Sequence, residues 1–170
     1  AAMLIEARCP GAALCFGELD RAEAEAAAAL CRATLGQDTS LPVCVDAQAL
    51  WARLVGVVPT VEGLWHSVLA WFRGEPGVAH EELLRLSGKD AGVRWLRSEL
   101  GACRSLQQYG AMQRMVEWLN ATQDLETLLR VACLDPEGPR FPLTLTVSAV
   151  VDTCVTCAPA ARVGLQALAP

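Results

Sequence analysis

The residues best suited to chemistry in this sequence are its eight cysteines, two of which form the motif Cys154-Val155-Thr156-Cys157. A CxxC pair can bind zinc or exchange disulfides, because thiolates are good metal ligands and nucleophiles. Structural zinc needs four ligands, however, and the sequence has no second CxxC motif. Thioredoxin-type exchange needs a βαβ context, which the neighbouring residues do not supply. We therefore predict no cofactor and no metal, and Cys154 and Cys157 are the one candidate pair of metal ligands.

An even number of cysteines also permits a disulfide framework, which is typical of shorter secreted chains with a higher density of cysteine. Several of the cysteines lie instead in apolar helical patterns, such as Cys31 after Ala27–Leu30 and Cys133 after Ala132. A reduced cysteine is a small buried hydrophobic residue in that setting. We expect reduced thiols in the core, and a disulfide-bonded secreted helical bundle is the alternative.

His66 and His80 are the two histidines and the first residues to consider for catalysis. A catalytic histidine needs a nucleophile and an orienting acid, but the sequence contains neither a GxSxG nor an HExxH motif. Ser87-Gly88-Lys89-Asp90 matches the end of a P-loop only in part, because Leu83 stands where that motif has its first glycine. The sequence therefore predicts a non-enzymatic protein, with a dispersed catalytic site as the alternative.

The net charge of −5 and the isoelectric point near 5.0 argue against a dominant nucleic-acid-binding surface. Basic residues exceed acidic ones only locally, between Glu81 and Arg114, where Arg94, Arg97 and Arg104 form a candidate basic patch. A solvated helix face produces the same pattern without any ligand. We favour the solvated face and expect no nucleic-acid partner.

The composition is typical of a packed helical protein. Hydrophobic residues make up 53% of the chain, charged residues 19% and aromatic residues 5%, with a mean hydropathy of +0.30. Such a chain is not disordered, and its abundance of alanine favours close-packed helices over a β-sandwich. The most apolar stretch, Leu143–Ala161, contains Asp152 and Pro159, so we expect no membrane span. The chain starts without a methionine or a signal-peptide pattern, which predicts a processed or excised segment of an intracellular protein, cytoplasmic or nuclear.

Helical periodicity runs through most of the chain and is interrupted by proline and glycine. Asp46 and Thr60 are suited to cap helices that begin after them, and Gly36 is suited to end one. The alternating residues Leu143–Val147 are typical of a strand, but an isolated strand would have no partner, so we favour a helix there. The predicted helices, eight or nine in all, cover about Glu18–Leu35, Asp46–Val57, Thr60–Phe72, Ala79–Leu86, Asp90–Leu100, Cys103–Leu119, Gln123–Leu134 and Leu143–Cys157, with a last helix after Pro159.

Three segments can each form a helix pair broken by proline or glycine: Asp46–Phe72, Ala79–Leu119 and Gln123–Cys157. In this arrangement the chain resembles helical-repeat proteins of the armadillo and HEAT kind. The resemblance implies short helices in antiparallel pairs and a scaffold that binds proteins through a helix-lined surface. A compact multi-helix bundle fits the same pattern. We expect one all-α domain over residues 1–170, part of a larger protein, with a sub-boundary conceivable at 73–78.

The excess of apolar residues points to a surface that other proteins cover. Trp65 lies one position from Leu64 and so partly off the apolar stripe that continues to Trp71. On an outer edge, Trp65, Leu69 and Phe72 would form a patch for a partner helix or peptide, and the alternative places Trp65 in the core. The leading hypothesis is a non-enzymatic protein–protein interaction scaffold. The second is a compact helical regulator, of the death-fold or apoptosis-regulator kind, that binds a partner helix in an apolar groove.

Overall fold

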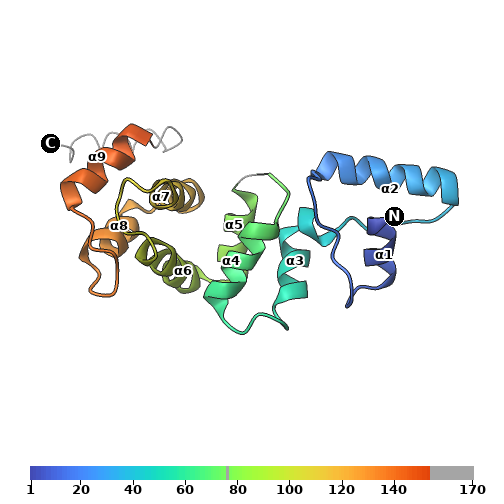
Figure 1. Cartoon of the computed structure of the whole chain (residues 1–170), viewed down its shortest axis with the longest axis horizontal. Coiled ribbons are helices and arrows are strands. Elements are labelled where there is room, and N and C mark those ends of the chain that lie inside the picture. Colours follow the sequence, from blue (N-terminus) through green and yellow to red (C-terminus); the bar gives the residue numbers. More distant parts are fainter. Residues whose placement is uncertain (76, 154–170) are drawn as a thin grey trace. The chain divides into compact units, whose positions relative to one another are not determined.

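In the computed structural model, residues 1–75 and 77–153 are described, and every regular element within these ranges is a helix (Figure 1). This confirms the predicted all-α multi-helix fold. None of the helices in this part of the chain combines the length and the hydrophobicity that a bilayer crossing requires. The α-helices are α1 (Ala2–Arg8), α2 (Arg21–Leu35), α3 (Ala47–Leu54), α4 (Val61–Trp71), α5 (Val78–Ser87), α6 (Lys89–Gly101), α7 (Tyr109–Thr122), α8 (Leu125–Leu129) and α9 (Leu143–Thr153), with a 3₁₀-helix η1 (Val43–Val45) and a π-helical turn η2 (Arg130–Leu134).

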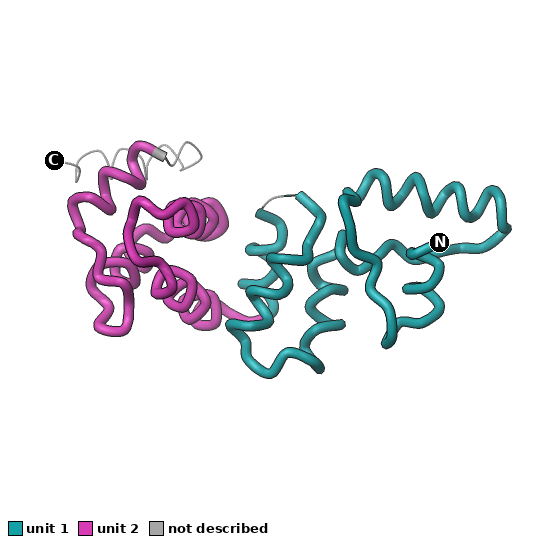
Figure 2. Tube along the Cα trace, viewed as in Figure 1, with its two compact units in different colours: residues 1–86 teal, residues 87–170 magenta. Residues whose placement is uncertain are grey.

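The chain divides into two compact units, which we call unit 1 (Ala1–Leu86) and unit 2 (Ser87–Pro170) (Figure 2). Helices α1 to α5 belong to unit 1, with α5 ending at the boundary, and helices α6 to α9 belong to unit 2. The segment 73–78, where we considered a sub-boundary, connects α4 to α5 inside unit 1.

Helix α2 begins and ends where its sequence provides caps. The Asp20 carboxylate accepts a hydrogen bond from the backbone N–H of Glu23 at 2.8 Å, and the Glu23 carboxylate accepts one from the backbone N–H of Asp20 at 3.1 Å. This capping box satisfies backbone donors that have no partner inside the helix. Gly36 ends α2 in the left-handed conformation, with φ of 63°. The predicted helix Glu18–Leu35 is therefore confirmed, with its first turn starting at Arg21.

The two other predicted caps are also present in unit 1. The Asp46 side chain accepts a hydrogen bond from the backbone N–H of Ala49 at 2.9 Å, and the Thr60 hydroxyl accepts one from Gly63 at 3.1 Å. Helix α3 ends at Leu54 and does not continue to Val57 as predicted. The Leu54 carbonyl instead accepts hydrogen bonds from the N–H groups of both Val57 and Val58, which turns the chain towards Thr60.

The core of unit 1 lies where α3 packs against η1 and α4. Helix α5 reaches α4 through an edge-to-face contact between Trp65 and His80, whose ring centroids are 6.3 Å apart. The most deeply buried hydrophobic side chains of unit 1 are Ala24, Cys44, Val45, Leu50, Leu64, Trp65, Val68 and Leu83.

The core of unit 2 is centred on α7, which contacts α6, α8 and α9. Helix α7 starts at Tyr109, although periodicity predicted a start at Cys103. The segment before it is a turn in which the Gln108 side-chain oxygen accepts a hydrogen bond from the Arg104 N–H at 2.5 Å. The most deeply buried hydrophobic side chains of unit 2 are Ala91, Trp95, Leu96, Leu100, Ala111, Met115, Trp118, Leu119, Leu128, Val131, Ala132 and Val150.

The last described segment is helical, as predicted, from Leu143 to Thr153, while residues 154–157 and the helix predicted after Pro159 lie outside the described residues. Thr146, Val147 and Val150 are buried on one side of α9. The Thr146 hydroxyl donates to the carbonyl of Pro142 at 2.9 Å, one turn earlier. This local bond satisfies the buried Thr146 hydroxyl within the helix. The alternating threonines of this segment are typical of a strand, but the bond makes Thr146 compatible with a helix.

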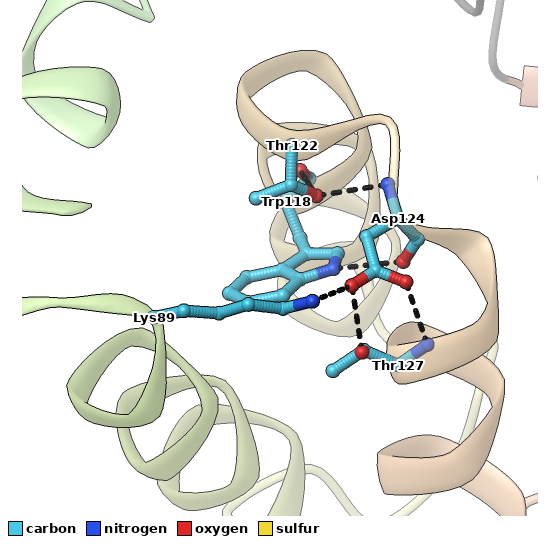
Figure 3. A network of polar contacts seen from close by, with 5 residues as sticks. All are labelled: Lys89, Trp118, Thr122, Asp124 and Thr127. Atoms are coloured by element: carbon cyan, nitrogen blue, oxygen red, sulfur yellow. Dashed lines mark hydrogen bonds and ion pairs between the residues drawn. The ribbon is translucent and has the colours of Figure 1, made fainter.

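A polar network joins three helices of unit 2 around Asp124, the N-cap of α8 (Figure 3). Its carboxylate accepts hydrogen bonds from the backbone N–H of Thr127 at 3.0 Å and from the Thr127 hydroxyl at 2.7 Å, and it pairs with the Lys89 ammonium of α6. The Trp118 indole N–H of α7 donates to the Asp124 carbonyl at 3.0 Å. Partial burial disfavours the charged carboxylate, but the bonds from Lys89 and Thr127 outweigh it and lower the pKa of Asp124 to about 2.

Candidate interaction site

Unit 1 contains an apolar pocket of about 320 Å³, which we call the thiol pocket. Its walls come from the segment between α1 and α2, from η1, from α3 and from the last residue of α4. Small-molecule sites start at about this size, and the volume is sufficient for one large apolar side chain. The lining residues are Leu14, Cys15, Phe16, Cys44, Leu50 and Trp71.

Two aromatic side chains at the thiol pocket remain in contact with solvent. Phe16 is 58% exposed and Trp71 is 39% exposed, and Leu14 beside them is also exposed. The rings of Phe16 and Trp71 meet edge to face, with centroids 6.4 Å apart and an angle of 61° between their planes. This geometry is favourable for an aromatic pair, so the two rings form a preformed apolar edge.

Arg73 stabilises this apolar edge through contacts with Phe16 and with backbone carbonyls. Its guanidinium lies over the Phe16 ring, 4.5 Å from the centroid, in a cation–π contact. The same guanidinium donates to the carbonyls of Gly17 at 3.3 Å and Ala70 at 3.0 Å, and the Arg73 backbone N–H donates to the Cys44 carbonyl at 2.6 Å. A single residue thus ties the end of α4 to the segment before α2 and to η1.

Glu6 of α1 also connects the segment before α2 to η1. The side chain is buried, with 4% of its surface exposed. One carboxylate oxygen accepts a hydrogen bond from the backbone N–H of Cys15 at 2.9 Å, and the other accepts one from Val43 at 3.1 Å. The one signal for this role in the sequence is the spacing of Glu6 three residues after Met3, which places both on one face of a helix. Both residues are buried in the structure. We did not predict this role.

Both thiols of the pocket are protonated at neutral pH. Burial raises the pKa of the Cys15 thiol above its usual 9.0, and the nearby Glu6 carboxylate raises it further. Burial also raises the pKa of Cys44, with additional contributions from Cys15 and Glu6. The pocket therefore presents a largely apolar and uncharged lining.

Trp65 does not lie on an outer edge, and its burial agrees with the alternative that places it in the core. Trp65 is 1% exposed, and the His80 ring of α5 packs edge to face against it. Leu69 and Phe72 are half-buried. The exposed tryptophan of α4 is instead Trp71, which the helical stripe had placed with the core.

The candidate basic patch is divided by acidic residues. Arg97 binds the Asp135 carboxylate, with Nε–Oδ2 at 2.8 Å, and also the Glu137 carboxylate at 3.2 Å. A backbone hydrogen bond from Glu137 lowers the pKa of Asp135, and the Arg97 guanidinium contributes to the same shift. Arg94 and Arg104 are exposed, but Arg97 between them is compensated, so the three do not form a uniformly positive surface.

Candidate metal ligands are dispersed in the part of the chain that the structure describes. Within residues 1–75 and 77–153, no group of three or more histidine, cysteine or acidic side chains is arranged to hold a metal ion. Cys154 and Cys157 lie outside the described residues. His66 is exposed on α4, whereas His80 is buried against Trp65. The cysteines in the described part of the chain are free thiols: Cys9, Cys15, Cys31, Cys44, Cys103 and Cys133.

Comparison with protein-family models, curated sequences and solved structures finds no significant match to this chain.

Proposed function

We propose that this chain is a non-enzymatic protein-interaction scaffold and that unit 1 binds an apolar segment of a partner protein at the thiol pocket. The observation that carries the proposal is the exposed pair Phe16 and Trp71 at the edge of an apolar pocket. Large aromatic side chains normally bury most of their surface in the core. Here two adjacent rings remain exposed and contact each other edge to face, and the Arg73 guanidinium lies over the Phe16 ring.

The residue types at this edge support protein recognition. Interface hot spots are enriched in tryptophan and arginine, and they cluster around pockets that an anchor side chain can fill. Because Arg73 already holds Phe16 in place, little side-chain entropy would be lost when a partner covers the ring. A partner that inserts a leucine, methionine or phenylalanine would remove apolar surface from water on both sides of the contact.

The same pocket also supports the second candidate, a compact helical regulator that accepts a partner helix. Helix-in-groove recognition uses a few apolar anchors at helical spacing, and the first of these would enter the thiol pocket. Both candidates place the binding energy at Phe16 and Trp71, so one experiment addresses the shared element.

The test uses a photo-reactive benzophenone amino acid at position 16 of the full chain to identify a protein in contact with the pocket. That protein is then purified and titrated against the wild type, Trp71→Ala and Tyr109→Ala. Tyr109 is the matched control, because it is an aromatic residue of unit 2 that is 81% exposed. We expect Trp71→Ala to weaken binding about tenfold or more and Tyr109→Ala to change it less than about twofold. Equal affinities for the wild type and Trp71→Ala would contradict the proposal.

A further inference from the structure

Two cysteines from distant parts of unit 1 meet at the thiol pocket. Cys15 belongs to the segment between α1 and α2, and Cys44 belongs to η1. The Glu6 carboxylate accepts one hydrogen bond from the N–H of Cys15 and one from the N–H of Val43, the residue before Cys44. Two amides that bind the two oxygens of one carboxylate must lie close together. Glu6 therefore holds the two cysteine-bearing segments side by side.

The two thiols differ in their access to solvent. Cys15 is partly exposed, whereas Cys44 is 1% exposed and its carbonyl is fixed by the Arg73 backbone N–H. A reagent from solution therefore reaches Cys15 more readily than Cys44, and both residues line the same apolar pocket. An accessible thiol beside a second thiol can serve as the attacking cysteine, with the second as the resolving cysteine. Because burial and Glu6 raise the pKa of Cys15, this exchange requires alkaline pH.

We propose that Cys15 and Cys44 form a reversible disulfide with each other. The oxidant is a low-molecular-weight disulfide such as oxidised glutathione. At alkaline pH the Cys15 thiol loses its proton, and the resulting thiolate attacks one glutathione sulfur, which breaks the glutathione S–S bond, forms a mixed disulfide and releases one glutathione thiolate. The Cys44 thiolate then attacks the Cys15 sulfur and releases the second glutathione. Two thiols of the protein are oxidised, one glutathione disulfide is reduced, and the two protons end on the two glutathione thiols.

The new bond would connect the segment that carries Leu14 and Phe16 to η1. It would close a loop of about 30 residues, which restricts the unfolded chain and raises the melting temperature by about 5–10 °C. The inference concerns the thiols alone and does not depend on whether a partner protein binds at the pocket.

The test is mass spectrometry of the full chain with Cys9→Ser, which leaves Cys15 as the single cysteine of its tryptic peptide, residues 9–21. The reduced protein is equilibrated with oxidised and reduced glutathione at mildly alkaline pH. We expect a species lighter by about 2 Da, a cross-link between the tryptic peptides 9–21 and 33–53, and full reversal by dithiothreitol. Adding Cys15→Ser or Cys44→Ala should abolish the cross-link. Adding Cys103→Ser, which removes another partly buried thiol, should leave it intact.

Two results would overturn the inference. One is a stable glutathione adduct on Cys15, heavier by about 305 Da, that Cys44 does not resolve. The other is a cross-link from peptide 9–21 to a peptide other than 33–53. Because Cys15→Ser changes a partly exposed residue, it keeps the test informative if Cys44→Ala does not fold.

Discussion

The Glu6 carboxylate accepts a hydrogen bond from the backbone N–H of Val43, which lies 37 residues further along the chain. Its second oxygen binds the N–H of Cys15. The Glu6 side chain, which belongs to a seven-residue helix, thus accepts hydrogen bonds from two backbone N–H groups outside its own helix.

Glu6→Gln should destabilise the protein by about 1–3 kcal/mol, because the amide retains one acceptor and turns a donor towards a backbone N–H. Urea denaturation followed by circular dichroism measures the loss. Glu25→Gln is the matched control, since Glu25 is exposed and forms a surface pair with Arg21, and it should change the stability by less than about 0.5 kcal/mol. Equal effects of the two substitutions would show that the bonds of Glu6 are not important.

Asp124→Asn should lower stability at neutral pH and lose its effect in acid. The pKa of Asp124 is about 2 in the folded protein against 3.8 ordinarily, so its charge stabilises the fold above about pH 5, and this contribution is lost as the pH falls from about 4 to 2. Asparagine still caps a helix, so the substitution removes mainly the charge.

With allowance for solvent screening, we expect Asp124→Asn to cost about 1–2 kcal/mol at pH 7. Urea titrations at several pH values between 2 and 7 measure the difference from the wild type. Asp90→Asn, at an exposed position in the first turn of α6, is the control. A difference in stability between the wild type and Asp124→Asn that stays constant down to pH 2 would contradict the stabilising role of the Asp124 charge.

Trp65→Ala should destabilise the protein more than Trp71→Ala does. Trp65 is 1% exposed, so its truncation leaves a cavity and should cost about 3–5 kcal/mol. Trp71 is only partly buried and should cost clearly less in the same thermal melt. A larger loss for Trp71→Ala than for Trp65→Ala would reverse the roles that the structure gives these two residues.

Two glycines of the α6 region should respond to alanine in opposite directions. Gly88 precedes α6 with φ of 81° and ψ of 164°, a conformation that L-residues rarely adopt, so Gly88→Ala should cost about 1–3 kcal/mol. Gly101 lies inside the last turn of α6, and a Cβ there meets no atom within 4 Å. Gly101→Ala should therefore stabilise the protein by about 0.5–1 kcal/mol, as measured by thermal melts.

Capping residues in the sequence predicted three helix ends correctly, whereas periodicity misplaced the end of α3 and the start of α7. The caps at Asp46 and Thr60 and the left-handed Gly36 depend on hydrogen bonds or backbone freedom within a few residues. The helix from Leu143 was predicted from the lack of a partner strand, and the local bond of Thr146 is consistent with it.

The candidate site was not predictable from the same signals. Trp65 contacts His80 of α5 and Trp71 contacts Phe16, and nothing within α4 predicts either contact. The thiol pocket combines residues from four segments, and Glu6 and Arg73 connect three of them, the segment before α2, η1 and the end of α4, through contacts to backbone groups. Periodicity describes one face of one helix and carries no information about such contacts.

Helix α2 buries only Ala24 among its 15 residues, so little tertiary packing supports it. Its helicity depends on alanine propensity, the capping box and Gly36, and helices supported in this way melt gradually with temperature. All five tryptophans lie in other segments, at positions 51, 65, 71, 95 and 118. On heating, the far-ultraviolet circular dichroism should therefore decline before the tryptophan fluorescence changes, and the amide protons of α2 should exchange with solvent earliest among the longer helices.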